Sequence, residues 1–308
     1  MNLRQLAIFT GVVEEGSFNR GAQRLNATQS GLSMQIRNLE ERLGVQLLER
    51  SPQGVVPTRE GQFFYRRAIE ILRLVDSAAV DLRDMAESVG GPLRVGLMPS
   101  FTRGLLAPIL EKFLRDYPLV QVSVTEAYSA VLTDTIIAGG VDFAIVPRTT
   151  PPDALVTTFF GTDREVLVCR PGGTLPHLAP VQLSDCIPLK LVLPGAGNAR
   201  RDTLERVIAQ KGLPVTQIID MDAMIATLEF VAVSDYATIL PTTVCTKDLD
   251  GTERWLHPII DPIMNVDYAV LEPAARSLPV AARLFLERLT DEYKLVQSRW
   301  QSVLDQSN

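Results

Sequence analysis

The stretch that most constrains the fold of this chain is residues 17–44, which read SFNRGAQRLNATQSGLSMQIRNLEERLG and predict two short helices joined by a tight turn. Ser17 and Thr28 stand where helix N-caps are expected, because a hydroxyl there accepts a hydrogen bond from the first helical turn. Gly44 stands where a C-cap glycine ends the second helix. Between the last two caps, apolar residues at spacings of four, three and four form one buried stripe: Leu32, Ile36, Leu39 and Leu43.

Another face of the second helix carries amides, hydroxyls and a guanidinium, which are the groups that read base edges in a major groove. Gln29, Ser33 and Arg37 recur there every four residues, and no carboxylate precedes Glu40 and Glu41, one turn further on. The pattern predicts a helix-turn-helix whose second helix reads DNA, although an ordinary helical hairpin would show the same apolar stripe. The predicted DNA contacts are Thr28, Gln29, Ser30, Ser33, Met34, Arg37 and, further along the chain, Arg50.

The sequence around this motif closely resembles the N-terminal domain of LysR-type transcriptional regulators. The resemblance runs without a gap over residues 2–61 and includes EEGSF, LGVQLLER and VVPTREG. The chain departs from the family pattern at Ser30, where proline is usual, and at Gly21 and Gly31, where alanine is usual. Met34 replaces a polar or basic residue and cannot donate to a base or a phosphate. We therefore expect the DNA target to differ from a typical one.

Charge is unevenly distributed along the 308 residues. The net charge of −6 argues by itself against nucleic acid, but residues 1–58 hold six arginines against five glutamates and are one charge positive. A weakly basic head binds non-specific DNA weakly, so we expect that dimerisation is needed for useful affinity. No apolar run reaches membrane-spanning length and the N-terminus shows no signal segment, which predicts a cytoplasmic protein without a membrane partner.

Two short strands at residues 45–50 and 54–57 predict a wing, with Arg50 at its base as a phosphate contact. A long helix follows from Thr58, with apolar residues at alternating spacings of four and three, as in the seam of a two-chain coiled coil. The predicted dimerisation residues are Phe64, Ala68, Ile71, Val75, Ala78 and Leu82, and Met85 continues the seam. A dimer would place two DNA-binding domains around one two-fold axis, which predicts binding to an interrupted palindrome. The binding species is a homodimer, or the homotetramer that the resemblance implies.

The rest of the chain predicts a two-lobed α/β domain beyond a hinge at residues 88–92. Strands and helices alternate in the order of a doubly wound sheet, which we expect to be parallel. The pieces LRVGLMPS, GGVDFAIV and EVLVCRPG resemble the effector domain of LysR-type regulators, itself similar to periplasmic binding proteins. The predicted domains are a helix-rich winged helix-turn-helix at 1–58, a linker helix and hinge at 59–89, and an effector domain at 90–308, with one lobe at about 93–163 and 267–300 and the other at about 164–266.

Ligands of open α/β sheets bind beyond the carboxyl ends of the strands, so the residues there are candidates for an effector site. Hydroxyls and helix N-termini at three of these ends suit a small anion, and a guanidinium could pair with it in bidentate fashion. The resemblance places effector contacts at the positions of Ser100, Thr102, Ser129 and Arg148, and in the second-lobe loop that contains Asn198. Each hydroxyl residue has the alternative role of capping its helix.

Two further predictions concern the rim of this cleft. Arg200 and Arg201 are expected to be solvated helix residues. Where the family usually has Gly-x-Gly, this chain has Ser234, Asp235 and Tyr236. We expect these larger side chains to fill or reshape the mouth of the cleft, and Asp235 to repel a second anionic group.

Three other functions compete with that of a ligand-responsive regulator. An enzyme is disfavoured, because His177 and His257 are the only histidines and no nucleophile elbow, HExxH, Walker or GxGxxG pattern occurs. A periplasmic solute-binding protein would lack the DNA-reading head. A constitutive DNA-binding protein with a vestigial cleft stays open. Three scattered cysteines predict neither a disulfide framework nor a metal site, and no cofactor is implied, although a thiol redox switch stays open.

The favoured hypothesis is a ligand-responsive transcription regulator. Its predicted partners are double-stranded operator DNA, a small anionic effector and further copies of the chain, with RNA polymerase as an additional candidate.

Overall fold

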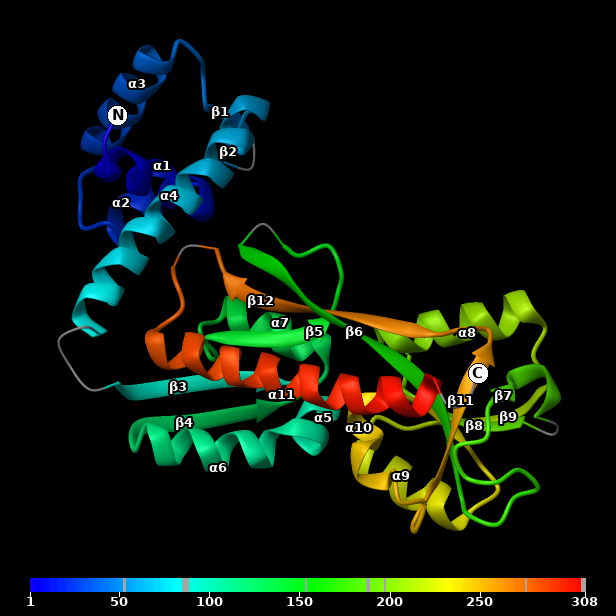
Figure 1. Cartoon of the computed structure of the whole chain (residues 1–308). Coiled ribbons are helices and arrows are strands. Elements are labelled where there is room, and N and C mark those ends of the chain that lie inside the picture. The colour runs from blue at the N-terminus through cyan, green and yellow to red at the C-terminus, as the bar shows by residue number, and fades with distance from the viewer. Residues whose placement is uncertain are drawn as a thin grey trace. The chain divides into compact units, whose positions relative to one another are not determined.

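The computed structural model describes residues 1–51, 54–84, 89–152, 154–186, 189–196, 198–274 and 276–305 (Figure 1). The chain divides into two compact units. One holds Met1–Glu87, Pro151–Val156 and Pro273–Leu278, and the other holds Ser88–Thr150, Thr157–Glu272 and Pro279–Asn308. Part of the predicted wing turn, residue Met85 of the seam and Ser88 of the hinge lie outside the described residues.

Three helices begin the first unit: α1 Leu3–Glu15, α2 Phe18–Arg24 and α3 Gln29–Leu43. The predicted caps are confirmed, because the hydroxyl of Ser17 accepts a hydrogen bond from the Arg20 N–H and that of Thr28 accepts one from the Gly31 N–H. Gly44 ends α3 in the left-handed region, with φ of 72°. The helix-turn-helix therefore has the boundaries that its sequence signals predict.

The apolar stripe of α3 faces the core of this unit. Leu32, Ile36 and Leu39 are buried together with Phe9 of α1. The fourth predicted member, Leu43, is 38% exposed, because α3 ends at this residue and nothing further packs over its last turn. The stripe is thus one residue shorter than predicted.

The wing is a two-stranded antiparallel sheet of β1 Leu48–Ser51 and β2 Gly54–Pro57. Glu40 of α3 holds its base, since one carboxylate oxygen accepts the backbone N–H groups of Leu47 and Leu48 at 2.7 and 3.1 Å. The following helix, α4 Arg59–Asp84, approaches this segment so closely that a Cβ on Gly61 would lie 1.9 Å from the Leu47 carbonyl oxygen. Glycine is therefore required where α4 crosses the wing.

The second unit has two lobes joined by long strands. In the first lobe, β3 Gly90–Leu97 lies between β4 Leu119–Glu126 and β5 Phe143–Pro147 and is parallel to both. The strand β12 Asn265–Pro273 continues this sheet antiparallel to β5 and neighbours β6 Leu155–Cys169. Figure 1 shows β6 and β12 running from the first lobe into the second.

The second lobe packs around the far half of β6. The strands β10 Thr238–Pro241 and β11 Trp255–Asp261 both pair with β6 in antiparallel fashion. Two more strands, β8 Leu189–Leu193 and β9 Val215–Asp220, form a parallel pair, and a single bridge joins Leu191 of β8 to Ala237, just before β10. The remaining elements are β7 Val181–Gln182, α8 Ala199–Lys211, α9 Met224–Val233, α10 Thr242–Cys245 and 3₁₀ turns at Leu183–Asp185 and Thr246–Asp248.

The two-lobed α/β architecture is confirmed, and so is the parallel order expected for β3, β4 and β5, but the sheet as a whole is mixed. Parallel pairs occur inside each lobe, whereas every pair described between a lobe and the crossing strands β6 and β12 is antiparallel. The crossing strands run back and forth between the lobes, so they cannot all share one direction. The sheet is mixed for this reason.

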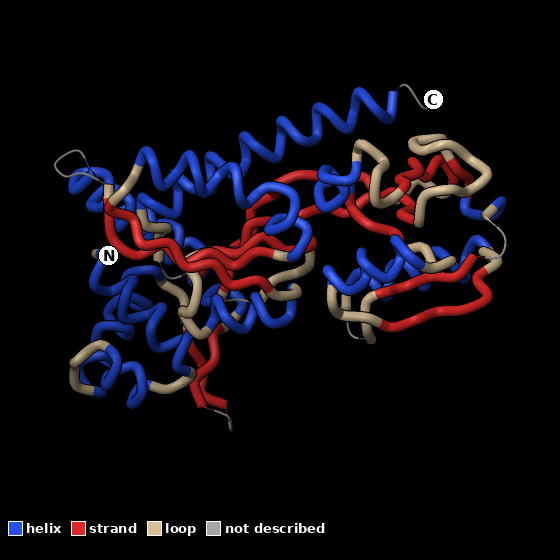
Figure 2. Tube along the Cα trace, turned by 90° about the horizontal axis from the view of Figure 1, so that it is seen from below, coloured by secondary structure: helices blue, strands red, loops and turns tan. Residues whose placement is uncertain are grey.

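Three helices flank the first lobe: α6 Ala107–Asp116, α7 Ser129–Ile137 and the C-terminal α11 Val280–Asp305. Figure 2 shows α11 lying along the sheet. The helical segment that leads into α6 is irregular. It begins at α5 Pro99–Phe101 and passes through a π-helical segment, Thr102–Leu106, just before Pro108, which has no N–H to donate to the preceding turn.

Two other differences concern strand ends. Gly90, Gly91 and Pro92, predicted as hinge, belong to β3 and pair with β4. The strand β11 was not predicted, because its sequence WLHPIID interrupts the apolar run with His257 and Pro258. Among the helices of the described residues, none is long and apolar enough to cross a membrane.

Candidate DNA-binding and effector-binding sites

The exposed face of α3 gathers the residues predicted to read DNA. Gln29, Ser30 and Arg37 are exposed, Ser33 is half-buried and Met34 is 58% exposed. None of their side chains makes a hydrogen bond or ion pair within the described part of the chain, so all are available to a partner. Thr28 is exposed but uses its hydroxyl as the cap of α3. The side chain of Arg50 lies outside the described residues, and its phosphate contact stays a prediction.

The predicted dimerisation seam on α4 divides into two parts. Ala68 is fully buried in the core of its own unit, and the ring of Phe64 packs on that of Phe9 at a centroid distance of 5.2 Å. In contrast, Ile71 and Val75 are 38% and 41% exposed. The first turns of α4 thus pack on the chain's own head, which leaves Ile71 and Val75 as the described candidates for a partner chain. The side chains of Ala78 and Leu82 lie outside the described residues.

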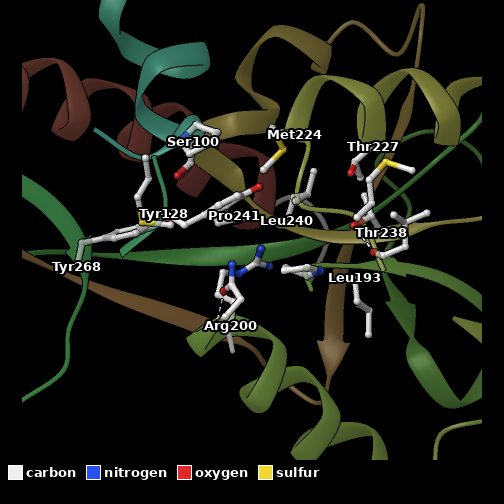
Figure 3. Close-up of a pocket in the computed structure, with 16 residues that line it drawn as sticks. Ser100, Tyr128, Leu193, Arg200, Met224, Thr227, Thr238, Leu240, Pro241 and Tyr268 are labelled. Carbon is white, nitrogen blue, oxygen red and sulfur yellow. Dashed lines mark hydrogen bonds between the residues drawn. The ribbon is translucent and has the colours of Figure 1, made fainter. Parts of the chain in front are cut away.

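A small cavity between the two lobes of the second unit is the candidate effector site (Figure 3). Its volume is about 30 Å³, which is room for one or two water molecules. Of the predicted effector residues, Ser100 and Asn198 line it. Most of its wall is apolar, with Met98, Met221 and Met224 among the flexible contributors. The free space between the lobes at this site is therefore small.

Five helices begin at this cavity, which is its main electrostatic feature. The residues at or beside their N-termini that line it are Ser100 of α5, Tyr128 before α7, Asn198 before α8, Met224 of α9 and Pro241 before α10. The N-cap residues of α7 and α9 make no side-chain capping bond, so the first backbone N–H groups of these two helices have no side-chain acceptor at the cap. No aspartate or glutamate is among the described lining residues. The cavity favours an anion.

Three predicted effector contacts do not line this cavity. Thr102 points away, because its hydroxyl bonds to the Pro99 carbonyl and to the Glu126 carboxylate. Ser129 begins α7, but its neighbour Tyr128 supplies the lining side chain. Arg148 follows β5 as predicted, and lines a separate cavity. The roles of Thr102, Ser129 and Arg148 as effector contacts stay predictions.

The expectation that Arg200 and Arg201 are solvated is wrong. The guanidinium of Arg200 lies beneath the cavity and donates to Oε1 of Glu165 from Nε at 2.9 Å and from Nη2 at 2.5 Å. Its Nη2 also donates to the Ile239 carbonyl at 2.7 Å. Arg201 has a side chain that is only 11% exposed and pairs with Glu205 and Asp220. Both arginines therefore fasten the start of α8 rather than face solvent.

Tyr268 of β12 is a lining residue that the sequence did not indicate. Its side chain is fully buried, and its hydroxyl lies beside the Ser100 hydroxyl, the neighbouring polar side chain in the wall of the cavity. Burial raises the pKa of Tyr268 well above the usual value, so the hydroxyl is a neutral donor. The buried hydroxyls of Ser100 and Tyr268 together offer hydrogen bonds to a water or a ligand in the cavity. Tyr268 thus marks a polar position inside an otherwise apolar wall.

The effect predicted for Asp235 and Tyr236 is wrong. Asp235 forms an ion pair with Lys190 at 2.7 Å, and the Tyr236 hydroxyl donates to Gln217 at 2.9 Å. Both partners lie on the first halves of β8 and β9, whereas the cavity is reached at the end of β8. Neither residue lines the cavity, so neither fills its mouth nor repels an anion there.

Comparison with known families identifies both halves of the chain. The sequence profile of the bacterial regulatory helix-turn-helix proteins of the lysR family matches residues 3–62, and that of the LysR substrate-binding domain matches residues 86–294. The chain belongs to the LysR family. It is a LysR-type transcriptional regulator with a substrate-binding domain, and its relatives are regulators rather than enzymes.

Individual relatives agree over most of their length. The chain is 30% identical to the transcriptional regulator BenM of Acinetobacter baylyi, over 85% of this chain and 86% of BenM. It is 27% identical to the nitrogen assimilation regulatory protein Nac of Klebsiella aerogenes, over 94% of both chains. The fold also matches full-length CbnR in complex with its target DNA, at a TM-score of 0.54 and 22% identity, covering 95% of this chain and 99% of CbnR.

Proposed function

We propose that this LysR-family chain binds an interrupted palindrome in promoter DNA as a dimer or tetramer, and that a small anionic effector modulates the binding from the interlobe cavity. The observation that carries the effector half is the convergence of the starts of α7, α8 and α9 and of the Ser100 and Tyr268 hydroxyls on a cavity whose described lining has no carboxylate. The place of action is the cytoplasm, where promoter DNA is found. RNA polymerase is a further proposed partner at the promoter.

The DNA-reading half of the proposal rests on α3. Its exposed amide, hydroxyl and guanidinium groups are unpaired within the described residues, and the first turn holds no acidic residue that would repel phosphate. Glu40, the nearest acid, is occupied by the backbone N–H groups of the wing. Base edges in a major groove are the natural partners for such a face.

The size of the cavity supports a mechanism of regulation. At about 30 Å³, the closed cavity is too small for an organic anion, so the lobes must move apart on the crossing strands β6 and β12 to admit one. An effector that binds one arrangement of the lobes better than another shifts the balance between them. A coupling of about 1–3 kcal/mol between effector and operator is typical of such a system.

The proposal is tested by measuring operator affinity of variants on the reading face. We expect Gln29→Ala and Arg37→Ala each to weaken binding to the specific operator by about 1–3 kcal/mol, because each removes a base contact. Arg42→Ala, in the last turn of the same helix and outside the assigned face, is the matched control. Fluorescence anisotropy with the operator and with a scrambled duplex separates specific from non-specific binding. Unchanged operator affinity in both variants would contradict the assignment of this face.

A further inference from the structure

A second cavity in the effector unit has a volume of about 320 Å³ and shares only Arg200 with the effector cavity among the described lining residues. Its walls come from the end of β5, the first turns of α8 and the crossing strands β6 and β12. A ligand here would touch both lobes and both of the strands that join them. Its volume is at the low end of the range of about 300–1,000 Å³ that is typical of small-molecule sites.

The polar groups of this cavity carry both signs of charge. The backbone N–H of Arg148 donates to the Asp267 carbonyl at 2.7 Å, which fixes Arg148 beside β12. One carboxylate oxygen of Asp267 accepts from Thr162 at 2.6 Å, and Oε1 of Glu165 takes both bonds from Arg200. Among the described residues, this leaves the Arg148 guanidinium, one oxygen of Asp267 and Oε2 of Glu165 without a hydrogen bond. Two arginines and two carboxylates give the wall no net charge.

We propose that this cavity binds a zwitterionic α-amino acid with an apolar side chain. The ligand carboxylate pairs with Arg148, whose planar guanidinium offers two parallel donors. The ligand ammonium donates to the free oxygens of Asp267 and Glu165. The side chain lies on the apolar wall, of which Leu204 is a part. A simple anion or cation would satisfy only half of these groups, so the site selects for both charges on one molecule.

The position of Arg200 gives this site a regulatory consequence, which rests on the proposed effector cavity. Glu165 holds the Arg200 guanidinium at the floor of that cavity. An ammonium that shares Glu165 leaves more of the Arg200 charge uncompensated, which favours an anion in the effector cavity. Each ligand then tightens binding of the other by the same factor.

The test is isothermal titration of the full chain with L-leucine, 4-methylpentanoate and L-leucinamide. These probes share one side chain, and the last two lack the ammonium and the carboxylate charge, respectively. We expect binding of L-leucine and a loss of about tenfold or more in affinity for each of the other two, because each loses a charge-assisted contact. Equal binding of all three, or binding of none, would overturn the proposal.

Matched variants locate the binding site. Arg148→Ala and Asp267→Asn change exposed side chains and should each weaken L-leucine binding by about tenfold or more. Ser100→Ala, which alters only the effector cavity, should leave it unchanged. Loss in Ser100→Ala with unchanged binding in the other two would move L-leucine to the effector cavity and overturn the second site. Operator binding is measured without amino acids, so failure here is separate from failure of the proposed regulator function.

Discussion

Asp248 is the buried carboxylate on which two arginines from different lobes converge. Arg103 of the π-helical segment lies 2.8 Å from one oxygen, and Arg254 lies 2.8 Å from the other. Arg254 is 2% exposed and also donates from Nε to the Leu228 carbonyl at 2.8 Å. The cluster joins the π-helical segment Thr102–Leu106, which directly follows α5, to α9. Residues of α5 and α9 line the effector cavity.

Removing the carboxylate should be strongly destabilising. Asp248→Ala leaves the buried Arg254 and the partly buried Arg103, whose side chain is 20% exposed, without their shared partner. Breaking a buried pair in this way costs about 3–5 kcal/mol. We expect a loss of that size in the free energy of unfolding, measured by urea denaturation. The control is Glu253→Gln, which alters a 73% exposed partner of the same Arg254 and should change stability by less than about 1 kcal/mol. A loss below 1 kcal/mol for Asp248→Ala would contradict the role of the cluster.

His257 is expected to make the stability of the fold depend on pH in the acidic range. It is 5% exposed, and with Nδ1 protonated it donates to the Ala179 carbonyl at 2.9 Å. Burial lowers the pKa of His257 below its ordinary value, and nearby His177 adds to this while the Ala179 bond opposes it. The unfolded chain therefore takes up a proton near pH 6.5, where the folded protein does not, so stability should fall as the pH drops below about 6.5.

The measurement is the urea midpoint of wild type and His257→Gln at several pH values between 5 and 8. The variant should lose less stability than wild type between pH 7 and 5.5, because the shifted group is gone. Parallel pH curves for the two proteins would show that other groups cause the loss.

At the scale of elements, α4 shows what periodicity predicts and what it does not. Alternating spacings of four and three predicted a long helix, and α4 runs from Arg59 to Asp84. The same spacings could not tell which apolar residues meet a partner chain. Phe64 and Ala68 pack on the chain's own head instead, because α4 must first cover the core that α1 and α3 leave open. An apolar stripe predicts that a helix face is buried, but it does not predict whether the same chain or a partner chain covers that face.

Dimerisation should therefore depend on the exposed part of the seam. We expect the double variant Ile71→Asn, Val75→Asn to shift the full chain toward smaller assemblies in analytical ultracentrifugation. Each side chain contributes about 1.5–3 kcal/mol when fully buried, and both chains of a dimer lose it. Arg66→Ala, on an exposed position off the seam, is the control and should sediment as wild type does. An unaltered assembly in the double variant would exclude the seam as the main contact.

The same limit applies to the effector cavity. Strand ends and helix starts follow from local signals, which is why the sequence could point to Ser100 and Asn198, two residues that line the cavity. Tyr268 and Arg200 could not be placed, because their positions depend on how β12 and α8 meet across the lobes. A tyrosine within the apolar run NVDYAVLEP has the same local pattern whether its hydroxyl reaches a ligand or a neighbouring side chain.

At the scale of the whole molecule, the order of elements predicted two α/β lobes but not the mixed sheet that joins them. The direction of β6 and β12 follows from the fact that each strand crosses from one lobe to the other. The local sequence of a strand does not show that it makes such a crossing. These two strands are nevertheless central to the proposed mechanism. They are the covalent route along which a change in lobe arrangement reaches the rest of the chain.

Overfilling the cavity should reproduce part of that change without a ligand. Ser100 is 3% exposed in a cavity of about 30 Å³, so Ser100→Phe cannot fit unless the lobes separate. Such overpacking costs about 1–3 kcal/mol of stability. If the lobes control the DNA-binding heads, the operator footprint should change and the affinity should shift by about 5–150-fold. Ser129→Phe, the same substitution at a half-buried serine outside the cavity, is the matched control. If both variants lose stability and neither alters the footprint, the cavity does not control the heads, and the chain is better explained as a constitutive DNA-binding protein.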